Sequence, residues 1–245
     1  MTPDDFLANL RRDADRMAEL APQGYGAPVP ACPGWTVLEA LVHTGEVYSH
    51  KVACMRLPGG PQTTDDWDHG PADGQDAAAW FRERLDELTT ELTSRGPAAA
   101  AYTWYEPDQT VGFWFRRMAQ ETAVHRVDVE SGFDAVTPVS DDLAVDGIDE
   151  VLDWFLSYRN EDVGPDGPGR GTVAVRTGDH IWRTTLTADE AVLSRDPGPA
   201  DAVVSGEPSE LLLWLWGRRP DGAVVREGDE ELLRAFRERL RVVTQ

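Results

Sequence analysis

The stretch Trp114–Asp128, WFRRMAQETAVHRVD, decides how this chain is interpreted, because it predicts a helix with two metal-ligand side chains one turn apart. Glu121 and His125 are four residues apart, so both side chains leave the same helix face and can converge on one ion. That face carries, at helical spacing, Trp114, Met118, Glu121, His125 and Asp128.

A third donor stands far upstream, at His43. Two imidazoles and one carboxylate can bind zinc or a similar divalent metal and leave coordination positions open. The same spacing also fits a solvated pair or a capped core histidine. The apolar neighbours of Glu121 and His125 favour burial, and unpaired burial of either group costs free energy that a shared cation would offset.

The bulk composition excludes several classes of partner. A formal net charge of -21 and a pI near 4.5 argue against nucleic acid and anionic membranes. The two cysteines, Cys32 and Cys54, form neither a disulfide framework nor a zinc knuckle. No signal peptide or membrane-spanning run is evident, so we expect a cytoplasmic protein with reduced thiols. The sequence does not indicate an oligomeric state.

The first part of the chain, residues 1–138, predicts a four-helix bundle of up-and-down topology. Pro, Gly and Asp make Leu57–Gly74 a loop. The apolar periodicity predicts a helix over Pro3–Leu20, one from Thr36 to about Arg56, one containing Phe81 and Leu92 that ends at Gly96-Pro97, and the Glu121/His125 helix, which stops near Gly132.

The remainder, residues 139–245, changes character and predicts a small α+β domain. A loop is expected at Asp162–Gly171. The pattern predicts helices over Asp141–Leu156, Ser209–Trp216 and a last segment to Val242, and strands over Thr172–Arg176, Ile181–Leu186, Ala191–Ser194, Ala202–Ser205 and Val224–Arg226.

Three stretches place the sequence in a known group: Val29–His43 (VPACPGWTVLEALVH), Glu121–Asp128 (ETAVHRVD) and Gly206–Arg218 (GEPSELLLWLWGR). In this order they resemble the mycothiol-dependent maleylpyruvate isomerase family. The resemblance implies an N-terminal DinB-like metal-binding bundle and a C-terminal domain similar to sterol carrier proteins.

The resemblance also implies site residues and a cosubstrate. It assigns His43, Glu121 and His125 as metal ligands, typically of zinc, and mycothiol, a low-molecular-weight thiol, as cosubstrate. It implies an active-site arginine that matches Arg218, with Arg219 adjacent. From chemistry alone, Arg218 could instead complement a helix C-terminus, or it could bind a carboxylate through both nitrogens.

The expected chemistry is a metal-bound thiolate adding to a small electrophile, as a cis-trans isomerase or an S-transferase. Two alternatives keep the metal: a hydrolase that uses zinc-bound water, and a noncatalytic metal- or small-molecule-binding protein. The sequence does not identify the second substrate.

Several neighbouring residues receive weaker assignments. Asp128 could accept the second ring N–H of His125, or it could lie at the surface. His50 and Cys54 are too far along their helix from His43 to share an ion and are interpreted as structural. Cys32 is interpreted as a packed thiol. The preferred interpretation of Trp214 and Trp216 is domain core.

Overall fold

The computed structural model describes residues 1–164 and 167–244. The chain forms two compact units, Met1–Thr137 and Pro138–Gln245.

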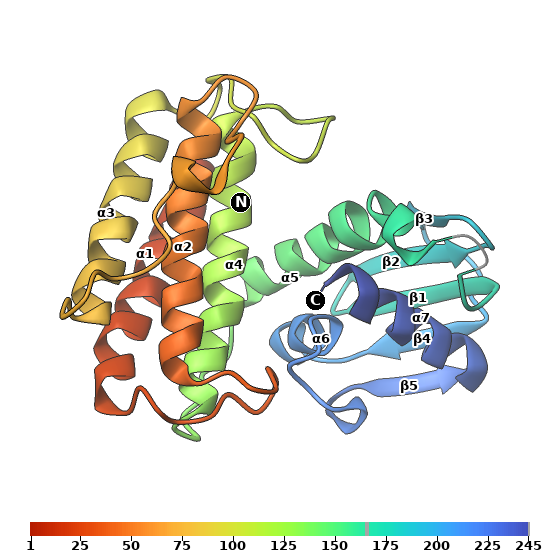
Figure 1. Cartoon of the computed structure of the whole chain (residues 1–245). Coiled ribbons are helices and arrows are strands. Elements are labelled where there is room, and N and C mark those ends of the chain that lie inside the picture. Colours follow the sequence, from red (N-terminus) through yellow and green to blue (C-terminus); the bar gives the residue numbers. More distant parts are fainter. Residues whose placement is uncertain (165–166, 245) are drawn as a thin grey trace. The chain divides into compact units, whose positions relative to one another are not determined.

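Four long helices form the first unit (Figure 1). Two of them begin at a capping box, in which a threonine and a carboxylate three residues later satisfy each other's backbone N–H groups. Thr2 pairs in this way with Asp5, and Thr36 with Glu39. The helices are α1 (Pro3–Leu20), α2 (Val37–Arg56), α3 (Ala77–Arg95) and α4 (Val111–Ser131), with short 3-10 turns η1 (Ala21–Gln23) and η2 (Thr64–Asp66).

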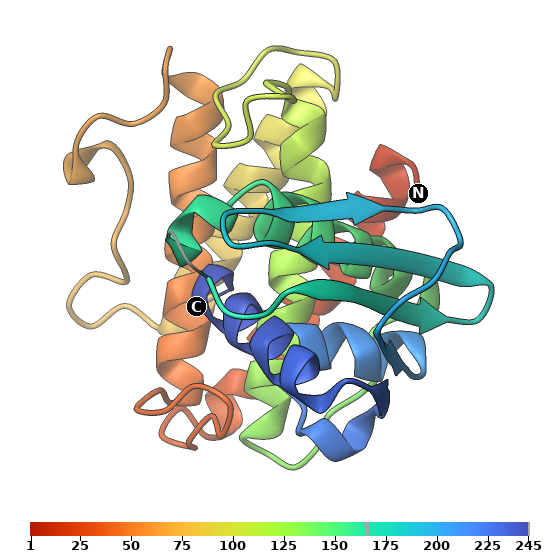
Figure 2. The same cartoon turned by 90° about the vertical axis from the view of Figure 1, so that its right-hand side faces the viewer.

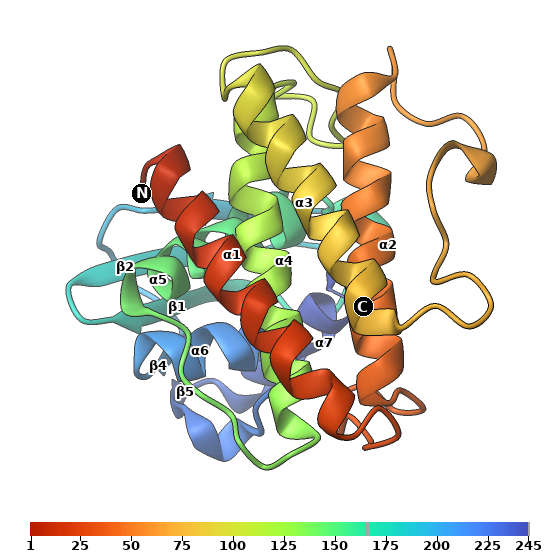
Figure 3. The same ribbon diagram turned by 90° about the vertical axis from the view of Figure 1, so that its left-hand side faces the viewer.

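The predicted helix boundaries are confirmed, but the up-and-down topology is wrong. Figures 1 and 3 show α2 and α3 running in the same direction, opposite to α1 and α4. Arg56, at the end of α2, donates to Glu87 and Glu91 late in α3, at 2.7 and 2.8 Å. Gly45, in the first half of α2, lies where an added Cβ would come 2.3 Å from the ring of Trp80, early in α3.

The segment 57–76 makes this topology possible, because it is long enough to run back along the bundle. Extended chain covers about 3.3 Å per residue, more than twice the ~1.5 Å rise of a helix. Asp68 fixes the segment: its N–H donates to Ser49 Oγ, and its carboxylate accepts from Trp80 Nε1, both at 2.8 Å. Loop composition reveals the loop but not its direction.

The second unit begins with α5, whose helical path continues to Ser157 through a π-helical segment, so the predicted Asp141–Leu156 helix is confirmed in extent. Residues 165–166 of the expected Asp162–Gly171 loop lie outside the described residues. The elements are α5 (Asp141–Glu150), η3 (Val151–Ser157), η4 (Asn160–Val163), β1 (Gly171–Thr177), β2 (His180–Leu186), β3 (Ala191–Ser194), β4 (Ala202–Ser205), α6 (Pro208–Leu215), η5 (Asp221–Ala223), β5 (Val225–Gly228) and α7 (Glu230–Val243).

The strands form one sheet in the order β3-β2-β1-β4-β5 (Figure 2). Only the β1–β4 pair is parallel among these strands, and the others are antiparallel. Helix α7 packs on β1 and β4, and η3 packs on β2 and β3. Trp214 and Trp216 are 1% and 6% exposed, which confirms that they are core residues.

The expected fold class, a helical N-terminal region followed by a small mixed-sheet domain, is therefore confirmed. Among the described residues, no helix has both the length and the apolar character that crossing a bilayer requires.

Candidate metal centre

Helices α2 and α4 bring His43, Glu121 and His125 together. His43 lies in the second turn of α2, and the other two residues face α2 from one turn of α4. The Oε1 atom of Glu121 is 3.8 Å from His43 Nε2 and 3.3 Å from His125 Nε2. All three donor atoms lie within 4.8 Å of one another.

These separations fit a single ion. Ligands bonded at about 2.0–2.2 Å in tetrahedral geometry are about 3.3–3.5 Å apart, so only small side-chain movements are needed. The His43 side chain is 38% exposed and the His125 side chain 8%, so the set is open on the His43 side. Three donors of this kind leave a position for an exogenous ligand.

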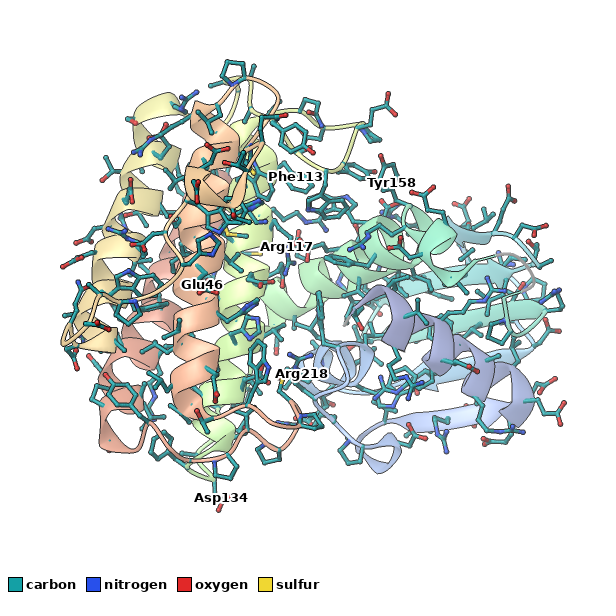
Figure 4. The ribbon with its side chains drawn as sticks, viewed as in Figure 1. Glu46, Phe113, Arg117, Asp134, Tyr158 and Arg218 are labelled. Atoms are coloured by element: carbon teal, nitrogen blue, oxygen red, sulfur yellow. The ribbon has the colours of Figure 1, made fainter. Side chains whose placement is uncertain are left out.

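Arg117, labelled in Figure 4, is a cation beside this set. It reaches Glu121 from one turn earlier on α4. Its guanidinium binds Oε2 of Glu121, which leaves Oε1 directed at the two imidazoles. Burial alone would raise the pKa of Glu121, but the charge of Arg117 and the interactions with His125 and His43 hold that pKa well below its usual range. The carboxylate is thus ionised and ready to bind a cation.

Asp128 lies on the other side of His125. Its Oδ2 is 3.0 Å from His125 Nδ1, so a proton on Nδ1 is held there and Nε2 points toward the other donors. Without a metal, burial lowers the pKa of His125, but the hydrogen bonds to Asp128 and Glu121 raise it to about 9. A metal must therefore displace a proton from this imidazole.

Trp35 forms a wall of the site that the sequence interpretation did not identify. Its ring centroid lies 4.9 Å from that of His43 and 6.2 Å from that of His125. Its sequence signals were its place directly before the cap of α2 at Thr36 and its position within the stretch Val29–His43 that carries the family resemblance. Arg117 was also missed, although its spacing of four residues from Glu121 is a regular ion-pair spacing on a helix.

The thiols and the remaining imidazole of α2 stand outside the donor set. Cys32 Sγ donates to Asp128 Oδ2 at 3.7 Å, so this neighbour is negatively charged and not a cation that would favour a thiolate. His50 Nδ1 contacts Lys51 Nζ at 2.8 Å and Cys54 Sγ at 3.8 Å. Burial and the charge of Lys51 lower the pKa of His50 to about 4, so this imidazole is neutral at physiological pH.

Two further charged side chains are Glu46, on the same helix as His43, and Arg218, which the sequence predicted as a site residue. Burial raises the pKa of Glu46, one turn from His43 on α2 (Figure 4). Arg218 belongs to the second unit and follows α6, where its Nη1 donates to the carbonyl of Trp216 at 2.8 Å. Its neighbour Arg219 pairs with Glu210 at 2.8 Å.

The fold and the donor set define a class: a helical bundle with a candidate divalent-metal centre, followed by a mixed-sheet domain. The model of the mycothiol maleylpyruvate isomerase N-terminal domain matches residues 6–130, and that of the MDMPI C-terminal domain matches residues 142–235. The chain belongs to the mycothiol-dependent maleylpyruvate isomerase family, which confirms the resemblance seen in the sequence. It is thereby assigned to a family of thiol-dependent isomerases, which are enzymes.

Two solved structures share the fold. The crystal structure of the mycothiol-dependent maleylpyruvate isomerase is 12% identical, with a TM-score of 0.56, and a histidine-to-alanine mutant of it is 12% identical, with a TM-score of 0.61. In both cases 95% of this chain and 96% of the other are covered. No curated protein matches this chain.

Proposed function

We propose that this protein is a zinc- and mycothiol-dependent enzyme that isomerises a small conjugated electrophile, or transfers the thiol to it. One observation carries the proposal: His43, Glu121 and His125 converge from two helices with separations that suit one divalent ion. When bound, the metal supplies the positive charge that favours the thiolate form of the cosubstrate.

The chain's own residues then have distinct tasks. Arg117 keeps Glu121 ionised, and Asp128 holds His125 so that Nε2 is presented. Trp35 shields the two imidazoles on one side. Arg218 is proposed to bind a substrate carboxylate, as the family resemblance implies, because a guanidinium can hold a carboxylate through two hydrogen bonds.

The proposed reaction needs no oxidant. The thiolate forms a sulfur–carbon bond to the conjugated double bond, and the displaced electron pair moves to the carbonyl oxygen as an enolate. The former double bond can then rotate. Return of the electron pair re-forms it and expels the thiolate. In a transferase, a proton from solvent would quench the enolate and the adduct would leave.

The test has two parts. Metal analysis of the purified protein should find about one zinc per chain, and maleylpyruvate should be consumed only when mycothiol is present. Turnover without thiol would support a zinc hydrolase instead, and tight ligand retention without turnover would support a binding protein. Either result would overturn the proposal.

We also propose a cytoplasmic location. A low-molecular-weight thiol cosubstrate requires a reducing compartment, and Cys32 and Cys54 are both free thiols in the structure.

A further inference from the structure

Lys51 is the only lysine of the chain, and its surroundings on α2 are unusual. Its Nζ donates to His50 Nδ1 at 2.8 Å and lies 5.3 Å from the ring centroid of Trp114 on α4. The rings of His50 and of Trp67, from the segment 57–76, meet edge to face with 4.6 Å between their centroids. We call His50, Lys51, Trp67 and Trp114 the lysine end of the α2–α4 interface.

This ammonium has no carboxylate partner within 4.0 Å in residues 1–164 and 167–244, in a chain with 44 acidic residues. Its contacts are a neutral imidazole and an aromatic face, and the side chain is only partly exposed. A cation taken from water without an anion costs free energy, and an aromatic face offsets only part of that cost. Burial accordingly lowers the pKa of Lys51, as does the nearby Arg117.

The lysine end lies beside the metal centre. Lys51 is eight residues from His43, a rise of about 12 Å along α2. Trp114 is seven residues from Glu121, which places it on the same face of α4. Glu121 is close enough to raise the pKa of Lys51, although burial outweighs that effect. Glu121 is itself bound to Arg117, so the positive charge of Lys51 is not neutralised by it.

We propose that Lys51 is a binding residue whose ammonium takes up a carboxylate of the substrate, so that the lysine end is an anion subsite next to the metal centre. This inference rests on the proposed function for its substrate class, a small anionic electrophile. Because the chain as a whole is strongly negative, a locally positive subsite would be needed to attract such a molecule. The rigid supports of Lys51 favour this role: Trp114 is held by its Nε1 hydrogen bond to the Tyr102 carbonyl, at 3.0 Å.

The experiment measures binding of maleate, a small dicarboxylate, by titration calorimetry. We expect Lys51→Met to weaken maleate binding about tenfold and Lys51→Arg to keep it within about threefold of the wild type. Arg11→Met is the matched control, because it removes one exposed positive charge of α1 and should change nothing. Each protein is tested zinc-loaded and EDTA-treated, since a carboxylate can also bind the metal. The loss in Lys51→Met should appear in both forms.

A second readout separates binding from structure. If Lys51 serves an absent anion, Lys51→Met should keep its metal content and unfold at an equal or higher temperature, because it removes an uncompensated cation. Undetectable maleate binding by the wild type, or equal affinity in Lys51→Met, would overturn the inference. Neither result would affect thiol-dependent turnover, whereas failure of that assay would leave the maleate result standing.

Discussion

The metal centre and the lysine end both hold a charged side chain between α2 and α4 with little access to water. They differ in how that charge is compensated. At the metal centre, Glu121 is largely buried beside Arg117 and the two imidazoles, so its charge is compensated within the protein. At the lysine end, Lys51 contacts a neutral imidazole and an aromatic ring, and no carboxylate of residues 1–164 and 167–244 lies within 4.0 Å of its ammonium. The metal centre can bind a cation because the Glu121 carboxylate is ionised and oriented. The lysine end is proposed to bind an anion at the Lys51 ammonium.

Replacing a metal ligand should have the largest effect of the changes proposed, because it should remove zinc binding at the metal centre and leave the lysine end unchanged. His43→Ala and His125→Ala should each abolish stoichiometric zinc binding, because a two-donor remnant holds the ion weakly. The measurement is zinc per chain after dialysis against a weak chelator. His50→Ala is the matched control: it removes an imidazole of the lysine end and should keep about one zinc. A full metal complement in both ligand variants would show that the donor set is wrong.

Arg117→Met should destabilise the metal-free protein by about 3 kcal/mol, since it leaves Glu121 largely buried without its cation. Zinc should reduce this loss, because the ion supplies the missing positive charge. Urea unfolding with EDTA and with zinc measures the difference. Arg11→Met on exposed α1 provides the control. An equal loss in both conditions would mean that Arg117 acts through contacts other than Glu121.

Asp128→Asn should weaken zinc binding about 10- to 100-fold while preserving the helix. The carboxylate that holds His125 Nδ1 becomes an amide, which orients the ring less firmly and makes it less basic. Competition with a fluorescent zinc chelator measures the affinity. Unchanged affinity would show that Asp128 does not support zinc binding through His125.

Sequence patterns predicted the elements well where one segment determines its own structure. Thr36 caps the start of α2 and Gly96 ends α3, and each acts within a few residues. The predicted start of α2 and end of α3 therefore lie close to those in the structure. Donor spacing on α4 likewise predicted that Glu121 and His125 lie close together, as they do in the structure. The direction in which α3 runs relative to α2 is not determined by neighbouring residues. It depends on the hydrogen bonds of Asp68, in the segment 57–76, with Ser49 and Trp80.

Trp35 and Lys51 were missed for the same reason, because their surroundings depend on contacts between distant parts of the chain. Trp35 lies against His43 and His125 only because the chain before α2 folds back over α4, which periodicity does not encode. In the sequence, Lys51 is an ordinary helix residue. Its proposed role depends on the lack of a carboxylate close to its ammonium among the described residues, which only the folded structure shows. Arg117 could have been found, because its spacing from Glu121 was visible in the sequence.

The pH dependence of zinc binding is the finest test of the metal centre. The metal-free protein holds a proton on His125, whose pKa is raised to about 9 from an ordinary value of about 6.5. Zinc must displace that proton, so its apparent affinity should rise up to about tenfold per pH unit and level off near pH 9. Isothermal titration in buffers of different ionisation enthalpy counts the protons released.

The stability of the metal-free protein should fall as the pH rises, whereas the zinc affinity should increase. A raised histidine pKa contributes stability that is fully present below about pH 6.5 and is lost as the pH rises through about 9. Urea unfolding in EDTA at several pH values would reveal this contribution, and Asp128→Asn should shrink it because one of the bonds that raise the pKa is weakened. Zinc affinity and metal-free stability rising together between pH 6.5 and 9 would contradict a protonated His125. The charge of Glu121 would then lack the positive charge of His125, and the metal centre would differ less from the lysine end.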